Sequence, residues 1–316
     1  MAEKPIFTDK KFVAIIASLC CLLWGSAYPS IKNGYLLFNI NSTDIPSKLL
    51  FAGYRFIIAG LILSIFAQKY GQKIFSLNKN NLSCIFILGI LQTTMQYLFF
   101  YIGVANTTGI KGSIMGSTIT FFSAILAHFV YANDKLTTKK IIGCILGFIG
   151  VMSANFSSDL FKFSFSFMGD GFVIVSAFFA AVAAIYSKNI FRNMDLITVT
   201  GYSLFIGGTM LALLGILCGG KVHHFTLSSS SILIYLALAT TVSFFLWNLL
   251  IKYNKVGSLA VYNFLTPIFG AILSSIFLGE TILELKNFIA FVLVFLGIWM
   301  VNKTSQECLK QISNEK

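Results

Sequence analysis

Charge is scarce in this sequence. Asp, Glu, Lys and Arg make up 11% of its 316 residues, whereas a soluble domain averages about 25%. Hydrophobic residues make up 57%, and the mean hydropathy is +0.83. So few charges cannot cover a water-facing surface, which excludes a soluble globular protein. We therefore predict a multi-pass protein of the cytoplasmic membrane that is in contact with membrane lipid.

Histidine is also scarce, and the cysteines are not paired in the sequence. There are three histidines, too few in the apolar runs for a multi-histidine metal site, and the six cysteines form no CxxC pair. Ser117 and His128 are separated by about 16 Å of helical rise, too far for a serine–histidine contact. We predict no enzyme activity, no cofactor and no metal. A proton-relay role for His128 stays open, because no Asp or Glu lies near the middle of an apolar run.

Acidic residues number 11 against 23 basic ones, for a net charge of +12. In a membrane protein, basic residues collect in cytoplasmic loops, so the excess requires no nucleic-acid partner. Asp134 and Glu280 lie at predicted helix ends beside Lys135 and Lys286. We expect them to form interfacial ion pairs or helix caps.

Long apolar runs occupy most of the chain. Windows of about 19 residues find ten runs, at 12–37, 48–67, 82–105, 109–132, 139–155, 169–189, 197–218, 230–252, 257–278 and 286–302. They predict an all-α polytopic fold with ten transmembrane helices. With a cytoplasmic N-terminus, 16 of the 23 basic residues fall on the inner side and six on the outer side, and Arg55 lies within a helix. This asymmetry predicts that both termini are cytoplasmic.

The two halves of the sequence are similar to each other. A shift of 146 residues aligns Thr94 with Thr240 and Thr120 with Thr266. Each half has five predicted helices, an odd number, so the second copy is inverted. We predict an N-terminal segment at 1–11, a first repeat at 12–155, a linker at 156–168, a second repeat at 169–302 and a tail at 303–316. Inverted repeats are typical of secondary transporters whose substrate site lies near the membrane midplane.

Three motifs point to one family. The first is LWGSAYPSIK at 23–32, the second is Tyr54-Arg55-Phe56 followed by Ala59-Gly60, and the third is Leu265-Thr266-Pro267 with Gly279-Glu280-Thr281 and Gly297. In this order, and over residues 12 to 302, they resemble the EamA-like branch of the drug/metabolite transporter superfamily. The first half departs from the pattern, with Phe121 opposite Pro267 and Asn133-Asp134 in place of Gly-Glu.

The resemblance implies movement of small metabolites, often amino acids or their derivatives, by alternating access. It also implies a central cavity lined chiefly by helices 1, 3, 4, 6, 8 and 9. Our first hypothesis is a metabolite exporter. The alternatives are an uptake carrier or exchanger of a nucleotide-like metabolite, and a membrane sensor or assembly protein that moves nothing. A homodimer is a further possibility.

Arg55 is the main candidate for a functional charge. It lies about seven residues, or roughly 10 Å, into its predicted helix. A charge at this depth is costly when it faces lipid, so it usually faces a cavity or a partner. A cavity arginine favours a carboxylate. Structural pairing and snorkelling to the outer interface are the alternatives.

Polar and aromatic residues on the predicted cavity helices complete the candidate site. Gln92 and Gln96 lie one turn apart, as do Trp24 and Tyr28, and Pro267 frees the carbonyl group of Asn263. Interhelical hydrogen bonds and an interfacial aromatic belt are the alternatives. The predicted substrate contacts are Trp24, Tyr28, Arg55, Gln92, Gln96, Tyr97, Ser117, Tyr186, Trp247, Asn248, Tyr262 and Asn263.

Overall fold

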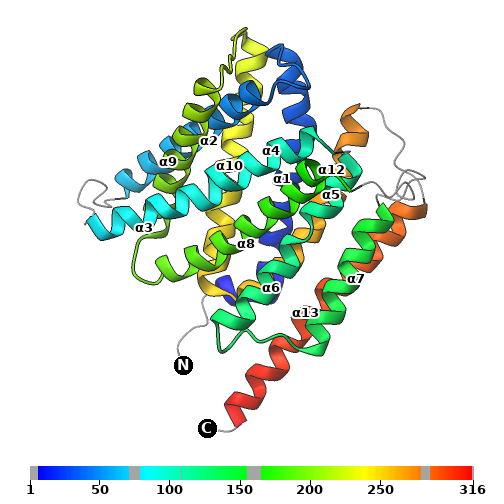
Figure 1. Ribbon diagram of the computed structural model, residues 1–316. Coiled ribbons are helices and arrows are strands. Elements are labelled where there is room, and N and C mark those ends of the chain that lie inside the picture. The colour runs from blue at the N-terminus through cyan, green and yellow to red at the C-terminus, as the bar shows by residue number, and fades with distance from the viewer. Residues whose placement is uncertain (1–5, 71–78, 108, 155–164, 279–284, 315–316) are drawn as a thin grey trace.

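The computed structural model describes residues 6–70, 79–107, 109–154, 165–278 and 285–314, and these form helices joined by turns, without a strand (Figure 1). The all-α class is confirmed for these ranges. The longer helices are α1 (Lys10–Leu37), α2 (Ile45–Lys69), α3 (Lys79–Gly89), α4 (Gln96–Ala105), α5 (Gly109–Gly116), α6 (Ile119–Val130), α7 (Thr138–Ala154), α8 (Phe172–Ile190), α9 (Leu196–Leu217), α10 (Leu227–Tyr253), α12 (Leu265–Leu278) and α13 (Leu285–Asn314).

Eight helical stretches in the described ranges are long and apolar enough to cross a membrane, and a shorter apolar helix spans Phe288–Asn302. The eight are Lys10–Leu37, Ile45–Lys69, Lys79–Ala105, Lys111–Val130, Phe167–Ile190, Leu196–Leu217, Leu227–Tyr253 and Val256–Leu273. The chain is therefore a multi-pass membrane protein. The count of ten spans stays a prediction.

Three of the predicted helices change geometry partway along. The third contains a π-helical segment, Ile90–Met95 (η2), between α3 and α4. The fourth breaks between α5 and α6, where the hydroxyls of Ser117 and Thr118 each donate to a carbonyl three residues earlier, both at 2.6 Å. Such side-chain bonds compete with the helical pattern. The fourth helix therefore bends without the proline that its counterpart has.

The ninth predicted helix is also divided. A short helix, α11 (Val256–Ala260), is followed by a 3₁₀ segment, Val261–Phe264 (η5), and then by α12. Pro267 is the third residue of α12, and its missing N–H leaves a backbone carbonyl without its usual partner one turn earlier. The two divided helices meet where Thr120 Oγ1 donates to the carbonyl of Ala260 at 3.0 Å.

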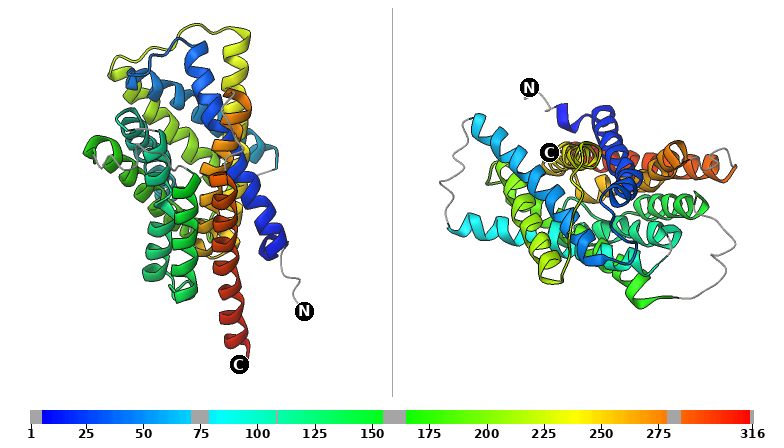
Figure 2. Two further views of the ribbon diagram at one scale, coloured as in Figure 1. Left: turned by 90° about the vertical axis from the view of Figure 1, so that its right-hand side faces the viewer. Right: turned by 90° about the horizontal axis from the view of Figure 1, so that it is seen from above.

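α1 begins and α13 ends at the same end of the bundle, which we call the terminal end (Figures 1 and 2). The turns between α6 and α7 and between α10 and α11 lie there too. The connections from α1 to α2 and from α9 to α10 lie at the opposite end.

α2 and α9 pack closely along their length because glycines face the partner helix. A Cβ added at Gly60 would lie 2.5 Å from the backbone nitrogen of Phe205, and one added at Gly53 would lie 2.6 Å from Cβ of Ala212. Both distances are shorter than a van der Waals contact. This packing holds α2 so that Lys48 and Arg55 reach the interior.

Candidate binding site

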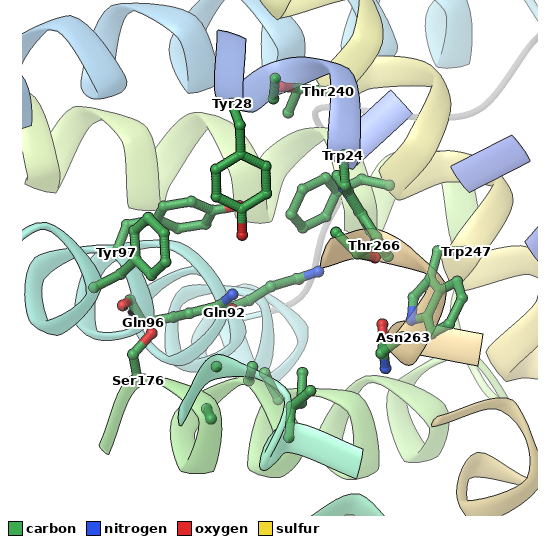
Figure 3. Close-up of a pocket in the computed structure, with 18 of the residues that line it drawn as sticks. Trp24, Tyr28, Gln92, Gln96, Tyr97, Ser176, Thr240, Trp247, Asn263 and Thr266 are labelled. Carbon is green, nitrogen blue, oxygen red and sulfur yellow. Dashed lines mark hydrogen bonds between the residues drawn. The ribbon is translucent and has the colours of Figure 1, made fainter. Parts of the chain in front are cut away.

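A cavity of about 440 Å³ lies in the middle of the bundle (Figure 3). Its lining is mainly apolar, with side chains from α1, α2, α4, α5, α6, α8, α10 and α12 and from the segments η2, α11 and η5. A volume of this size is typical of small-molecule sites. Ten of the twelve predicted contacts line it: Trp24, Tyr28, Arg55, Gln92, Gln96, Tyr97, Ser117, Trp247, Asn248 and Asn263. Their role in substrate binding stays a prediction.

Tyr186 and Tyr262 were also predicted in the cavity, but the structure places both outside its lining. Tyr262 is buried, and its hydroxyl accepts a hydrogen bond from Nδ2 of Asn302 at 2.8 Å. Because successive residues of the 3₁₀ segment point in different directions, Asn263 faces the cavity while Tyr262 faces α13. Tyr186 is half-buried and packs against the hydrophobic core.

Arg55 is 4% exposed and lies among aromatic rings. Its Cζ is 4.4 Å from the ring centroid of Phe56 and 5.5 Å from that of Tyr97, within the range of a cation–π contact. Its Nε has no hydrogen-bond partner among the described residues. The guanidinium group is therefore held inside the bundle, and the alternative of snorkelling to the interface is not what the structure adopts.

An aromatic pair forms another part of the cavity wall. The rings of Trp24 and Trp247 meet at 5.0 Å between centroids with an interplanar angle of 63°. Phe244 lies 6.0 Å from Trp24, edge to face. Figure 3 shows Trp24 and Trp247 on the side of the cavity away from Gln96 and Tyr97. Trp24 therefore lines the cavity together with Trp247.

Several buried polar atoms on lining residues have no hydrogen-bond partner within the described part of the chain. They include Trp24 Nε1, Arg55 Nε and Gln92 Oε1. An unpaired buried polar atom costs about 1–3 kcal/mol, and most such atoms in proteins are paired. They lie around one cavity, where a polar ligand can form hydrogen bonds with them.

The cavity has basic lining residues and, among the described residues, no acidic one. Lys32, Lys48 and Arg55 line it. The asymmetry of basic residues counts both lysines among the six on the outer side, so neither was among the predicted substrate contacts. A signal existed for Lys48, since it precedes Arg55 by seven residues and so shares its face of the helix.

The acidic residues whose side chains the structure describes have other partners. Asp9, Asp44 and Asp195 cap the N-termini of α1, α2 and α9. Asp170 accepts the hydroxyl of Thr107 at 2.5 Å. No group of three or more His, Cys, Asp and Glu that could hold a metal occurs among the described residues.

Asp134 joins two halves of the bundle at the terminal end. One carboxylate oxygen lies 2.5 Å from Nζ of Lys140, and the other accepts the backbone N–H of Gly257 at 2.8 Å. The expected partner, Lys135, instead donates to the carbonyl of His128 at 2.9 Å. Glu280 lies outside the described residues, so its expected pairing with Lys286 stays a prediction.

Two further residues connect the same region. Tyr131 donates to the carbonyl of Ile185 at 2.9 Å, and its hydroxyl lies 3.1 Å from Oδ1 of Asn189. His128 Nδ1 accepts the N–H of Leu136 at 3.1 Å, so His128 closes the turn after α6. It does not line the cavity.

These features together define a helical membrane protein with a central binding cavity, an architecture suited to transport. The family model of the EamA-like transporter family matches residues 11–156 and 167–303. The chain belongs to this family, within the drug/metabolite transporter superfamily.

Relatives agree with the family. The uncharacterized transporter YvbV of Bacillus subtilis is 26% identical over 94% of this chain and 93% of its own length. An uncharacterized transporter of Methanothermobacter thermautotrophicus is 24% identical over 88% of this chain and 87% of its own length. A crystal structure with 15% sequence identity matches with a TM-score of 0.76 over 95% of this chain and 99% of its own chain. This last likeness concerns the fold alone.

Proposed function

We propose that this protein is a secondary transporter of small zwitterionic or anionic metabolites, amino acids or related solutes, and not an enzyme. The observation that carries this proposal is the charge of the cavity. Lys32, Lys48 and Arg55 line it, and no described acidic side chain does. A carboxylate would be attracted there, whereas an organic cation would have no counter-charge.

The proposal includes ten spans in two inverted repeats, with both termini on the cytoplasmic side of the cell membrane. The two matched ranges, 11–156 and 167–303, support the division into two similar halves. The terminal end of the bundle is then cytoplasmic. The 16 basic residues expected on that side support the orientation.

Alternating access requires one end of the cavity to close while the other opens. The contacts of Asp134 with Gly257 and of Tyr131 with Ile185 join the first half to the second at the terminal end. Val256 and Leu259 line the cavity beside them and are buried. We infer that these contacts separate when the cavity opens to the cytoplasm. We also propose export as the direction, which the resemblance to the EamA-like family led us to expect.

Counterflow into proteoliposomes tests the substrate class. The probes are matched trios that share a side chain: an α-amino acid, its des-amino carboxylate and its decarboxylated amine, with side chains from methyl to benzyl. We expect labelled zwitterions or carboxylates to accumulate and amines to remain at background. Exchange of the amines alone would contradict the proposal, and inactivity with every probe would contradict transport of solutes of this class.

Direction needs a second measurement in cells. Expression of the protein should lower the intracellular content of the solute that exchanges in liposomes, because an exporter works against its accumulation. A rise in that content would identify an uptake carrier instead.

A further inference from the structure

Two buried cations of α2 face the same cavity. Lys48 is 9% exposed and Arg55 is 4% exposed, and both line the cavity. They are seven residues apart, so they lie on one face of α2 and about 10 Å apart along its axis. The cavity therefore has two basic positions, one deep in the bundle and one nearer the opposite end.

Neither cation has a carboxylate partner among the described residues. The nearest acidic residue in the sequence, Asp44, accepts the N–H of Ser47 at 3.0 Å and caps α2. Lys48 donates to the carbonyl of Ser42, and its Nζ lies 5.4 Å from the ring centroid of Tyr35. The Ser42 carbonyl and the Tyr35 ring carry no formal charge, and Asp44 lies close enough to Lys48 to interact electrostatically without forming an ion pair.

Buried charges in proteins are normally paired, because removing an ion from water is costly. Two cations face one cavity, neither is in an ion pair among the described residues, and no described acidic residue lines the cavity, so both can attract anions that enter it. Lys32 is exposed and also lines the cavity. It adds a positive charge that attracts anions toward Lys48 and then Arg55.

We propose that Lys48 is a second anion subsite and that the cavity selects metabolites with two anionic groups. One group would bind at Arg55 and the other at Lys48. Dicarboxylates and small carboxylic acids that carry a phosphate ester share this chemistry. The inference rests on the proposed transport function and narrows its substrate class.

Binding to the purified full-length protein tests this inference. Trp24 and Trp247 line the cavity, so tryptophan fluorescence reports its occupation. The probes are matched pairs with one or two anionic groups: butyrate and succinate, pentanoate and glutarate, glycerate and 3-phosphoglycerate. In the wild type, we expect each dianion that fits to bind about tenfold more tightly than its monoanion, the ratio expected for one charge-assisted hydrogen bond.

Lys48→Gln should lower this ratio to about one, because it removes the cation that holds the second anionic group and so weakens dianions more than monoanions. Lys48→Arg should keep the preference, because it keeps the charge. Lys221→Gln is the matched control, since Lys221 is an exposed lysine that does not line the cavity. It lies close to Lys48 in the fold, because its backbone N–H donates to Oγ of Ser47. An equal loss in Lys221→Gln would indicate an effect of net charge and would contradict a local subsite.

A measurement on the unmodified protein covers the case in which Lys48→Gln does not fold. Acetylation of lysines, followed by mass spectrometry, should show protection of Lys48 by the dianions and not by the monoanions. Equal binding of both members of every pair in the wild type, or no protection of Lys48, would overturn the second subsite and leave the proposed function intact. Failure of every anion to bind and to exchange in liposomes would instead overturn the proposed function.

Discussion

Lys140 and Arg55 are both buried cations, but they lie in different surroundings. Lys140, at the terminal end, has Asp134 at 2.5 Å. Arg55, in the cavity, packs against aromatic rings, and its Nε has no hydrogen-bond partner among the described residues. A paired buried charge stabilises one arrangement of helices, whereas an unpaired one costs stability until a ligand binds. We therefore expect removal of the charge at Lys140 to lower stability. Removal of the charge at Arg55 should instead lower transport while stability stays level or rises.

The largest expected effect is on the paired region. Lys140→Met leaves the carboxylate of Asp134 buried without its cation, which should cost about 3–5 kcal/mol of folding free energy. The double variant Asp134→Asn, Lys140→Met removes both charges and should recover most of this loss. Thermal unfolding in detergent measures both. Equal melting temperatures for Lys140→Met and the wild type would contradict a buried ion pair.

Arg55→Gln should lower transport without lowering stability. Transport should fall tenfold or more, because charge-assisted hydrogen bonds contribute about 1.5–3 kcal/mol, while the melting temperature stays level or rises. Arg55→Lys should rescue only in part, since an ammonium group lacks the planar fork that binds a carboxylate. Counterflow and thermal unfolding of the same preparations test this.

Arg192→Gln is the matched control for Arg55, because Arg192 is exposed and does not line the cavity. It should transport at the wild-type rate. If Arg55→Gln and Arg55→Lys also did so, Arg55 would be a structural residue. If neither accumulated in the membrane, it would be required for folding.

Variants of Tyr262 and of its neighbour Asn263 should have moderate effects, on stability for Tyr262 and on transport for Asn263. Tyr262→Phe removes the hydroxyl that accepts from Asn302, which should cost about 1 kcal/mol of stability and leave transport within twofold. Asn263→Ala should lower transport more than stability, because Asn263 lines the cavity. Reversed outcomes for the two variants would place Tyr262 in the transport path.

The smallest effect is expected at Lys32. Because this lysine is exposed at the cavity, Lys32→Gln should raise KM for an anion about twofold at low ionic strength. The difference should vanish near 1 M salt, where the screening length is about 3 Å. A salt-independent change in KM would show that Lys32 contacts the substrate directly.

Much of this protein could be predicted without coordinates. Low charge and long apolar runs determine an all-helical membrane protein, because a bilayer requires helices of about 20 apolar residues. The spacing of residues along each predicted helix, and their depth within it, also predicted ten residues that line the cavity, among them Trp24, Arg55 and Gln92. These properties depend on distances along a single helix, which the order of residues fixes directly.

Other features were decided only by the tertiary structure. Lys140 rather than Lys135 pairs with Asp134, and Tyr262 faces α13 while Asn263 faces the cavity. Each depends on how neighbouring helices pack and on where a helix breaks. Those arrangements arise from contacts between residues far apart in the chain, so a periodic pattern within one segment does not contain them.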